Sequence, residues 1–152
     1  YIEGNDFMKK RTITVCSYLI LIAVLVSCST KPSAYTPDTA KKNGDVVDVH
    51  AKITNMTRFE AFYANINSNK KDRIRVTRYT VEGYAILYDL EFDGKIIEST
   101  VDNTRDAFST EADRTVKKFE YSKLLKEAKE NTIEYNLYDI KGEKTNILVI
   151  SK

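Results

Sequence analysis

Residues 72–103 read DRIRVTRYTVEGYAILYDLEFDGKIIESTVDN, and this stretch decides the fold. Its β-branched and aromatic side chains alternate with polar ones, as they do along half-buried strands. Asp93-Gly94 interrupts the pattern with a dipeptide that favours a two-residue hairpin turn, because both of its residues tolerate a positive φ. The stretch therefore predicts three strands in a meander.

A turn centred on Asp93-Gly94 also fixes which residues of the last two strands face each other. The predicted pairs are Phe92–Lys95, Leu90–Ile97, Tyr88–Ser99 and Ile86–Val101. This register places the apolar residues of both strands on one face of the sheet. The opposite face would carry Asp89, Glu91, Glu98 and Thr100.

Two elements are expected before the meander. Residues 47–53 alternate apolar and polar side chains and predict one half-buried strand. Residues 55–69, NMTRFEAFYANINSN, place apolar side chains at helical spacing and predict a helix. Thr57 and Glu60 fit a capping box at its start, with Asn55 as a competing N-cap.

After the meander, residues 114–121 could form a further strand, and residues 132–151 predict a closing hairpin. Residues 122–131, SKLLKEAKEN, fit either a short helix or a strand and turn. Helix on one face of an antiparallel sheet gives an α+β domain. We expect about five to six strands and one helix within residues 46–152, and a second helix if residues 122–131 are helical.

Composition narrows the class of protein. The 24 Lys and Arg nearly balance the 22 Asp and Glu, which does not suit nucleic-acid binding through a concentrated basic surface. The two cysteines, Cys16 and Cys28, both lie near the N-terminus, so a disulfide framework or a cysteine nucleophile in the domain is excluded. No phosphate-binding glycine loop or zinc-protease motif is present, and we expect no cofactor and no metal.

The N-terminal segment has the order of a secretory signal peptide. A basic cluster follows Met8, and an uncharged apolar run then reaches Ser27. The run is shorter than the ~20 apolar residues of a membrane span, although an uncleaved anchor is the alternative. Residues 8–27 are therefore interpreted as the signal, and residues 1–7 as an upstream extension or remnant.

Residues 25–28, LVSC, resemble the lipobox of bacterial lipoproteins. The resemblance implies diacylglycerol on the Cys28 sulfur and cleavage just before Cys28, with the domain on the extracytoplasmic side of the cell membrane. Two acyl chains suffice for a lasting anchor, whereas one binds only marginally. Residues 28–45, rich in Ser, Thr, Lys and Pro, are expected to form a flexible tether.

Four stretches resemble a family of small lipoproteins from Bacillus-like bacteria that carry domain of unknown function 4362. They are VVDVH at 46–50, KDRIRVTRYTVEG at 71–83, DGK at 93–95 and DN at 102–103. The resemblance covers most of residues 44–106 and supports lipidation and a Gram-positive cell surface. It implies no activity, because the family is uncharacterised.

Arg73, Arg75 and Tyr79 fall on one face of the first meander strand and form the candidate partner-binding site. Arginine forks grip carboxylates and phosphates, so this face could hold a protein partner or an anionic polymer. The alternative is ordinary cross-strand pairing with acidic residues of the next strands. Arg78 points the other way and, if buried, would need a carboxylate such as Glu82.

Three weaker candidates remain. His50 is a candidate for a functional role, although a lone histidine near a strand end is usually a surface residue. Asp102, Thr104, Asp106 and Asp113 have the spacing of a calcium loop, but Ala107 replaces the required glycine. No acid pair lies in a recognisable hydrolase frame. The sequence thus favours a protein-interaction or inhibitor module over a binder of anionic ligands or cell-wall polymer, and either over an acid-based hydrolase.

Overall fold

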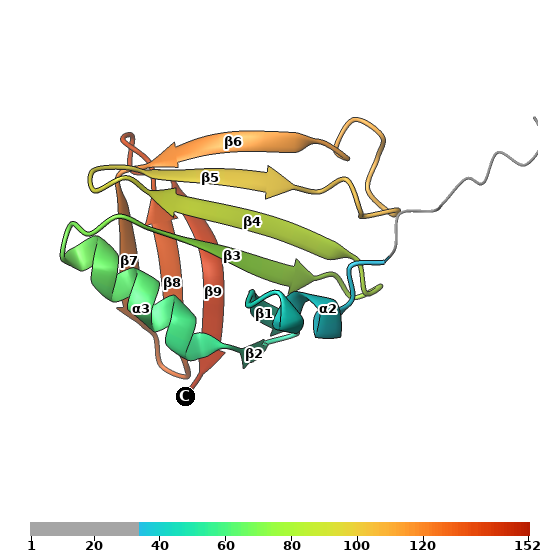
Figure 1. Cartoon of the computed structure of the whole chain (residues 1–152), viewed down its shortest axis with the longest axis horizontal. Helices are drawn as coiled ribbons and strands as arrows, with labels where there is room; N and C mark the ends of the chain where they lie inside the picture. The colour runs from blue at the N-terminus through green and yellow to red at the C-terminus, as the bar shows by residue number, and fades with distance from the viewer. Residues whose placement is uncertain (1–33) are drawn as a thin grey trace, which may run out of the picture. The chain divides into compact units, whose positions relative to one another are not determined.

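The meander forms as the sequence predicts. In the computed structural model of the chain, which describes residues 34–152, its strands are β3 (Asp72–Tyr79), β4 (Ala85–Phe92) and β5 (Ile97–Asp102). Strands β1 (Val46–Val49), β2 (Lys52–Thr54) and β6 (Val116–Tyr121) extend the meander into sheet A. The strand order is β2-β1-β3-β4-β5-β6 (Figure 1).

A second sheet, sheet B, follows without a long connection. Its strands are β7 (Lys123–Ala128), β8 (Thr132–Tyr138) and β9 (Lys144–Ser151), all antiparallel. Ser122 alone separates β6 from β7, and its backbone N–H donates to the Tyr138 carbonyl at 2.8 Å. The open question of residues 122–131 is therefore settled as a strand, in which Leu124 is buried and Leu125 is exposed.

Helix α3 (Met56–Asn67) confirms the helix expected over residues 55–69. It connects β2 to β3 and lies beside β3 in Figure 1. Asn55 precedes it with a left-handed φ of 63° and makes no side-chain cap bond. The Asn55 amide instead donates to the Gly44 carbonyl at 2.8 Å, so this residue ties the helix start to the chain before β1.

The main core is formed by side chains of sheet A, sheet B and helix α3. We call inner the face of sheet A that carries Ile74 and Val76, and sheet B and α3 cover it (Figure 1). The ring of Phe59 on α3 meets that of Tyr135 on β8 edge to face, with centroids 4.9 Å apart. The buried members are Val46, Phe59, Phe62, Ile74, Val76, Leu90, Phe92, Ile97, Tyr121, Leu124, Tyr135, Leu137, Ile147 and Leu148.

Helix α2 (Pro37–Lys42) lies in the segment expected to be a tether. Thr36 caps it by accepting the Thr39 N–H at 3.2 Å, and Pro37 occupies its first turn. Ala40 is fully buried against the other, outer face of sheet A, together with Val47 and Leu87. Residues 35–152 form one compact unit, so the folded part begins about ten residues before the predicted boundary at residue 46.

Strands β1 and β2 replace the single strand expected over residues 47–53. His50 and Ala51 have φ values of 52° and 66°, the left-handed conformation of a two-residue hairpin turn. The Asp48 carboxylate accepts the Ala51 N–H at 2.9 Å and steadies that turn. Neither residue is Gly or Asn, so no turn could be predicted here from residue type.

The hairpin between β4 and β5 differs from the prediction by a shift of two residues. Phe92 pairs with Ile97, because the loop spans residues 93–96 and not only Asp93-Gly94. The Asp93 carboxylate accepts the N–H groups of Lys95 and Ile96 at 2.7 and 2.9 Å, which closes the longer loop. A two-residue shift preserves which face each side chain occupies, so the predicted faces are correct.

The α+β class is confirmed, although sheet A is mixed and not purely antiparallel. Strand β1 runs parallel to β3, with Val46 opposite Val76. Val46 faces the inner core and Val47 faces the outer cluster, and burial on both faces is typical of parallel strands.

The N-terminal predictions cannot be compared with the fold. The upstream segment, the signal peptide and Cys28 all lie outside the described residues. Within residues 34–152, no helix is long and apolar enough to cross a membrane.

Candidate functional site

The three predicted site residues share the outer face of β3, as expected. Arg73, Arg75 and Tyr79 lie opposite Glu91, Asp89 and Ala85 of β4, respectively. Their surroundings differ sharply along the strand. Arg73 is exposed, Arg75 is half-buried and Tyr79 is only 8% exposed.

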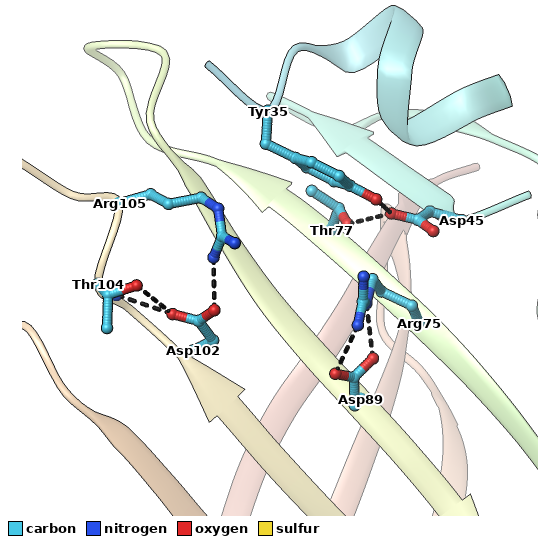
Figure 2. Close-up of polar contacts among 8 residues, drawn as sticks. All are labelled: Tyr35, Asp45, Arg75, Thr77, Asp89, Asp102, Thr104 and Arg105. Carbon is cyan, nitrogen blue, oxygen red and sulfur yellow. Dashed lines mark hydrogen bonds and ion pairs between the residues drawn. The ribbon is translucent and has the colours of Figure 1, made fainter. Parts of the chain in front are cut away.

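Arg75 pairs with its cross-strand neighbour Asp89. Its Nε and Nη2 atoms donate to the two carboxylate oxygens at 2.6 and 2.8 Å (Figure 2). The hydrogen bond to Asp89 raises the pKa of the guanidinium, so Arg75 stays charged at every physiological pH. The alternative of ordinary cross-strand pairing therefore applies to Arg75.

Tyr79 lies under the N-terminal segment. Its hydroxyl donates to the Tyr35 carbonyl at 2.8 Å. Burial raises the pKa of Tyr79 to about 12, with the nearby Tyr35 and Asp45 adding to the effect. Its ring belongs to the outer cluster with Ala40 and Leu87, where it supports α2 and is not presented to a partner.

A polar cluster around Tyr35 joins the N-terminal segment to the sheet (Figure 2). The hydroxyls of Tyr35 and Thr77 each donate to Asp45 Oδ2 at 2.7 Å, and Asp45 is only 5% exposed. The Arg105 guanidinium lies 5.7 Å from the centre of the Tyr35 ring and pairs with Asp102. Sequence reasoning missed this cluster, because Tyr35 fell within the expected tether.

An open groove of about 710 Å³ lies on the outer face beside this cluster. We call it the charged groove. Its lining is Asn43, Asp45, Arg73, Ile74, Arg75, Asp89, Leu90, Glu91, Glu98, Thr100 and Lys118. Four of these residues, Arg73, Glu91, Glu98 and Lys118, form no ion pair with any residue of 34–152. The groove thus presents two cations and two carboxylates to solvent.

The carboxylates of this face form a row across three strands. Glu91 of β4 lies directly opposite Glu98 of β5, and Glu98 lies opposite Glu120 of β6. Like charges directly opposite each other on adjacent strands destabilise a sheet. The acidic row therefore costs stability that a basic group from outside could restore.

Arg78 confirms the need for a carboxylate, but the partner differs from the one expected. Its Nε lies 3.5 Å from Asp48 Oδ2, on the neighbouring strand β1. Glu82 is exposed in the loop after β3. The parallel pairing of β1 with β3 places Asp48 opposite Arg78, and this pairing was not foreseen.

His50 is exposed in the turn between β1 and β2. The acids of the calcium-like spacing have other partners. Asp102 accepts hydrogen bonds from Thr104 and Arg105, and Asp113 accepts one from Thr110 at 2.7 Å. Across residues 34–152, no three His, Cys, Asp or Glu side chains lie close enough together to hold a metal ion.

Comparison with known proteins adds a family and no activity. No curated protein and no solved structure matches the chain. The model of one family, described as a domain of unknown function (DUF4362), matches residues 43–136. The match begins at the C-cap of α2 and ends within β8, so it includes all of sheet A and the charged groove. On this match the chain belongs to the DUF4362 family.

Proposed function

We propose that this protein is a lipid-anchored, extracytoplasmic binding module whose charged groove takes a charged segment of another protein. The observation that carries the proposal is the set of four charged side chains, Arg73, Glu91, Glu98 and Lys118, that lack an ion-pair partner within residues 34–152. They project from four neighbouring strands onto one open face.

The mixed sign of these charges favours a protein partner over an anionic polymer. The lining carries three cations, Arg73, Arg75 and Lys118, against four carboxylates, Asp45, Asp89, Glu91 and Glu98. A polyanion drawn to Arg73 would meet Glu91 directly opposite it. A protein segment with both acidic and basic side chains can match both signs, and such matching gives binding its specificity.

We favour binding over hydrolysis because of where the acids lie. Glu91 and Glu98 are both exposed to water on a sheet face. A general acid needs apolar surroundings that keep its proton at neutral pH, as in glycoside hydrolases. The groove offers a recognition surface and does not enclose a reacting group.

The anchoring part of the proposal rests on residues 25–28, LVSC, which lie outside the described residues. Replacing Cys28 with serine removes the thiol that would receive the lipid. We expect Cys28→Ser to move the protein from the membrane fraction to the soluble extracytoplasmic fraction or the medium. Unchanged membrane association of this variant would contradict lipid anchoring.

The binding part is tested by crosslinking in intact cells, followed by pull-down and mass spectrometry. Arg73→Glu and Glu98→Lys reverse one charge of each sign in the groove. Lys141→Glu and Glu111→Lys make the same changes at exposed positions outside its lining. We expect one protein to be recovered with the native chain and both controls, and lost with both groove variants.

The two groove variants also separate the kinds of ligand. A protein partner of mixed charge is weakened by both changes. An anionic polymer would be lost with Arg73→Glu and gained with Glu98→Lys, which would overturn the protein-binding proposal. Equal recovery from all five chains would exclude the groove as a binding site.

A further inference from the structure

Strand β6 is an exposed edge of sheet A. Within residues 34–152 it pairs only with β5, and Figure 1 shows it at the end of the sheet. Every residue of β6 except Tyr121 is exposed, including Val116 at 56% and Phe119 at 43%. An edge strand offers unpaired N–H and C=O groups to any second strand that can align with it.

The sequence of β6, VKKFEY, carries opposite charges on one face. Lys118 and Glu120 both point to the outer face, because they lie opposite Thr100 and Glu98 of β5. Phe119 points to the inner face, opposite Ser99. Glu120 ends the row of three glutamates, and no ion pair within the described part of the chain neutralises it.

We propose that two copies of this chain associate by antiparallel pairing of their β6 strands, with Phe119 at the two-fold axis. A two-fold axis perpendicular to the sheet keeps inner side chains on the inner face, so only residues of one face can meet. Centring the axis on Lys118 would oppose two lysines, and centring it on Glu120 would oppose two glutamates. Only the axis at Phe119 places Lys118 of each copy opposite Glu120 of the other.

This register would satisfy three features of the free edge: its unpaired backbone, its exposed phenylalanine and its uncompensated glutamate. It pairs the backbone of β6, and it brings the two Phe119 rings together on the inner face. It also sets a lysine beside the last member of the acidic row, which relieves the repulsion among Glu91, Glu98 and Glu120. The two six-stranded sheets would become one continuous sheet with a charged groove on each half.

Cysteine crosslinking of the full-length chain in mild detergent tests the register. The background carries Cys16→Ser and Cys28→Ser, which removes both native thiols. Directly opposed residues of an antiparallel pair have Cα atoms ~4.5–5.5 Å apart, within disulfide range. Phe119→Cys should therefore give a covalent dimer on mild oxidation.

Lys117→Cys is the matched control, because it lies on the same strand and the same face. Its two copies would be about 14 Å apart in the proposed register, too far for a disulfide. We expect it to remain monomeric under the same oxidation. Equal crosslinking of both variants, or none with Phe119→Cys, would overturn the proposal.

Charge reversal provides a second test, by sedimentation equilibrium of the full-length chain in the same detergent. Lys118→Glu and Glu120→Lys each turn two attractive contacts into repulsive ones, and we expect each to raise the dimer dissociation constant about tenfold. The double variant restores the pairing with exchanged signs and should return close to the native constant. A double variant as weak as the single ones would contradict the register.

This inference and the proposed binding function share Lys118, which lines the charged groove and would pair with Glu120 of the second copy, but the two proposals can be tested separately. Arg73→Glu should abolish partner capture and leave the dimer unchanged, since Arg73 lies on β3, three strands from the edge. A dimer without a captured partner would refute the groove alone. A captured partner with a monomeric native chain would refute the dimer alone.

Discussion

Strand β3 carries one ion pair with two hydrogen bonds on each of its faces, and these two pairs have similar geometry but different surroundings. On the inner face, Arg58 of α3 donates to both oxygens of Asp72 at 2.7 and 3.0 Å. On the outer face, Arg75 donates to both oxygens of Asp89 at 2.6 and 2.8 Å. The Asp72 side chain is 17% exposed, whereas that of Asp89 is 45% exposed.

The partners joined by each pair also differ. Asp72 additionally accepts hydrogen bonds from Asn65 Nδ2 and from the Arg73 N–H, both at 2.8 Å. Its carboxylate thus joins α3 to sheet A, two elements that no backbone ladder connects. The pair of Arg75 and Asp89 joins two strands that are already hydrogen-bonded. The same chemistry therefore holds the fold together on one face and shapes a surface on the other.

The largest loss of stability is expected from a substitution at Phe59, the apolar residue next to Arg58. Phe59 is fully buried and packs against Tyr135. Phe59→Ala should lower the free energy of unfolding by about 3–5 kcal/mol, because it removes a large side chain and leaves a cavity. Urea denaturation followed by circular dichroism suits a chain without tryptophan. Leu125→Ala, at a 37% exposed position, is the control, and an equal loss there would contradict a core centred on α3.

The inner ion pair should give an intermediate effect that depends on pH. Burial acts to raise the pKa of Asp72, but hydrogen bonds from Arg58 and Asn65 outweigh it and hold the pKa below the ordinary 3.8. The charged carboxylate therefore stabilises the fold fully above pH 3.8, and this contribution is lost as the pH falls through the lowered pKa.

Asp72→Asn should accordingly destabilise the protein by about 1–2 kcal/mol near neutral pH. The difference from the native chain should shrink as the pH falls below 3.8. Denaturation curves at a series of pH values measure it. Glu82→Gln is the control, since this exposed loop carboxylate lies outside the acidic row and accepts no hydrogen bond within residues 34–152. A difference independent of pH would show that Asp72 acts through shape and not through charge.

The outer ion pair should have the smallest effect. A double-mutant cycle with Arg75→Met and Asp89→Asn should give a coupling energy of about 0.2–1 kcal/mol, because water screens exposed pairs. The same cycle on Arg58 and Asp72 should give the larger value. Equal coupling energies would remove the distinction between the two faces.

The parts of the fold that could be predicted are those with a local signal. Residues 72–103 alternate in polarity, and α3 repeats its apolar residues at helical spacing, so both appear as expected. The parallel pairing of β1 with β3 has no such signal, because it depends on contacts between distant segments. The turn at His50-Ala51 was also hidden, since its left-handed backbone is held by Asp48 and not by a glycine.

Of the candidate site, only the face of the strand on which its residues lie could be predicted from the sequence. That Arg73, Arg75 and Tyr79 share a face follows from strand geometry. Which of them is free depends on residues from other elements, namely Asp89 on β4 and Tyr35 ahead of α2. Glu91 and Glu98 were already expected to share a face, but their direct pairing and the addition of Lys118 and Glu120 become visible only once strand order and register are known.

The parallel pairing of β1 has a consequence for the order in which the chain can assemble. Each strand of the meander is joined to the next by a short connection, so β3, β4 and β5 can pair as soon as they are free to fold. Strand β1 is made earlier but must wait for a partner whose residues lie 30 positions later, as Val46 and Val76 show. Until β3 is in place, the apolar side chains of Val46 and Val47, which face opposite sides of β1, lack their neighbours in the sheet. The hairpin of β1 and β2 is then the part of the unfinished domain most exposed to pairing with another chain.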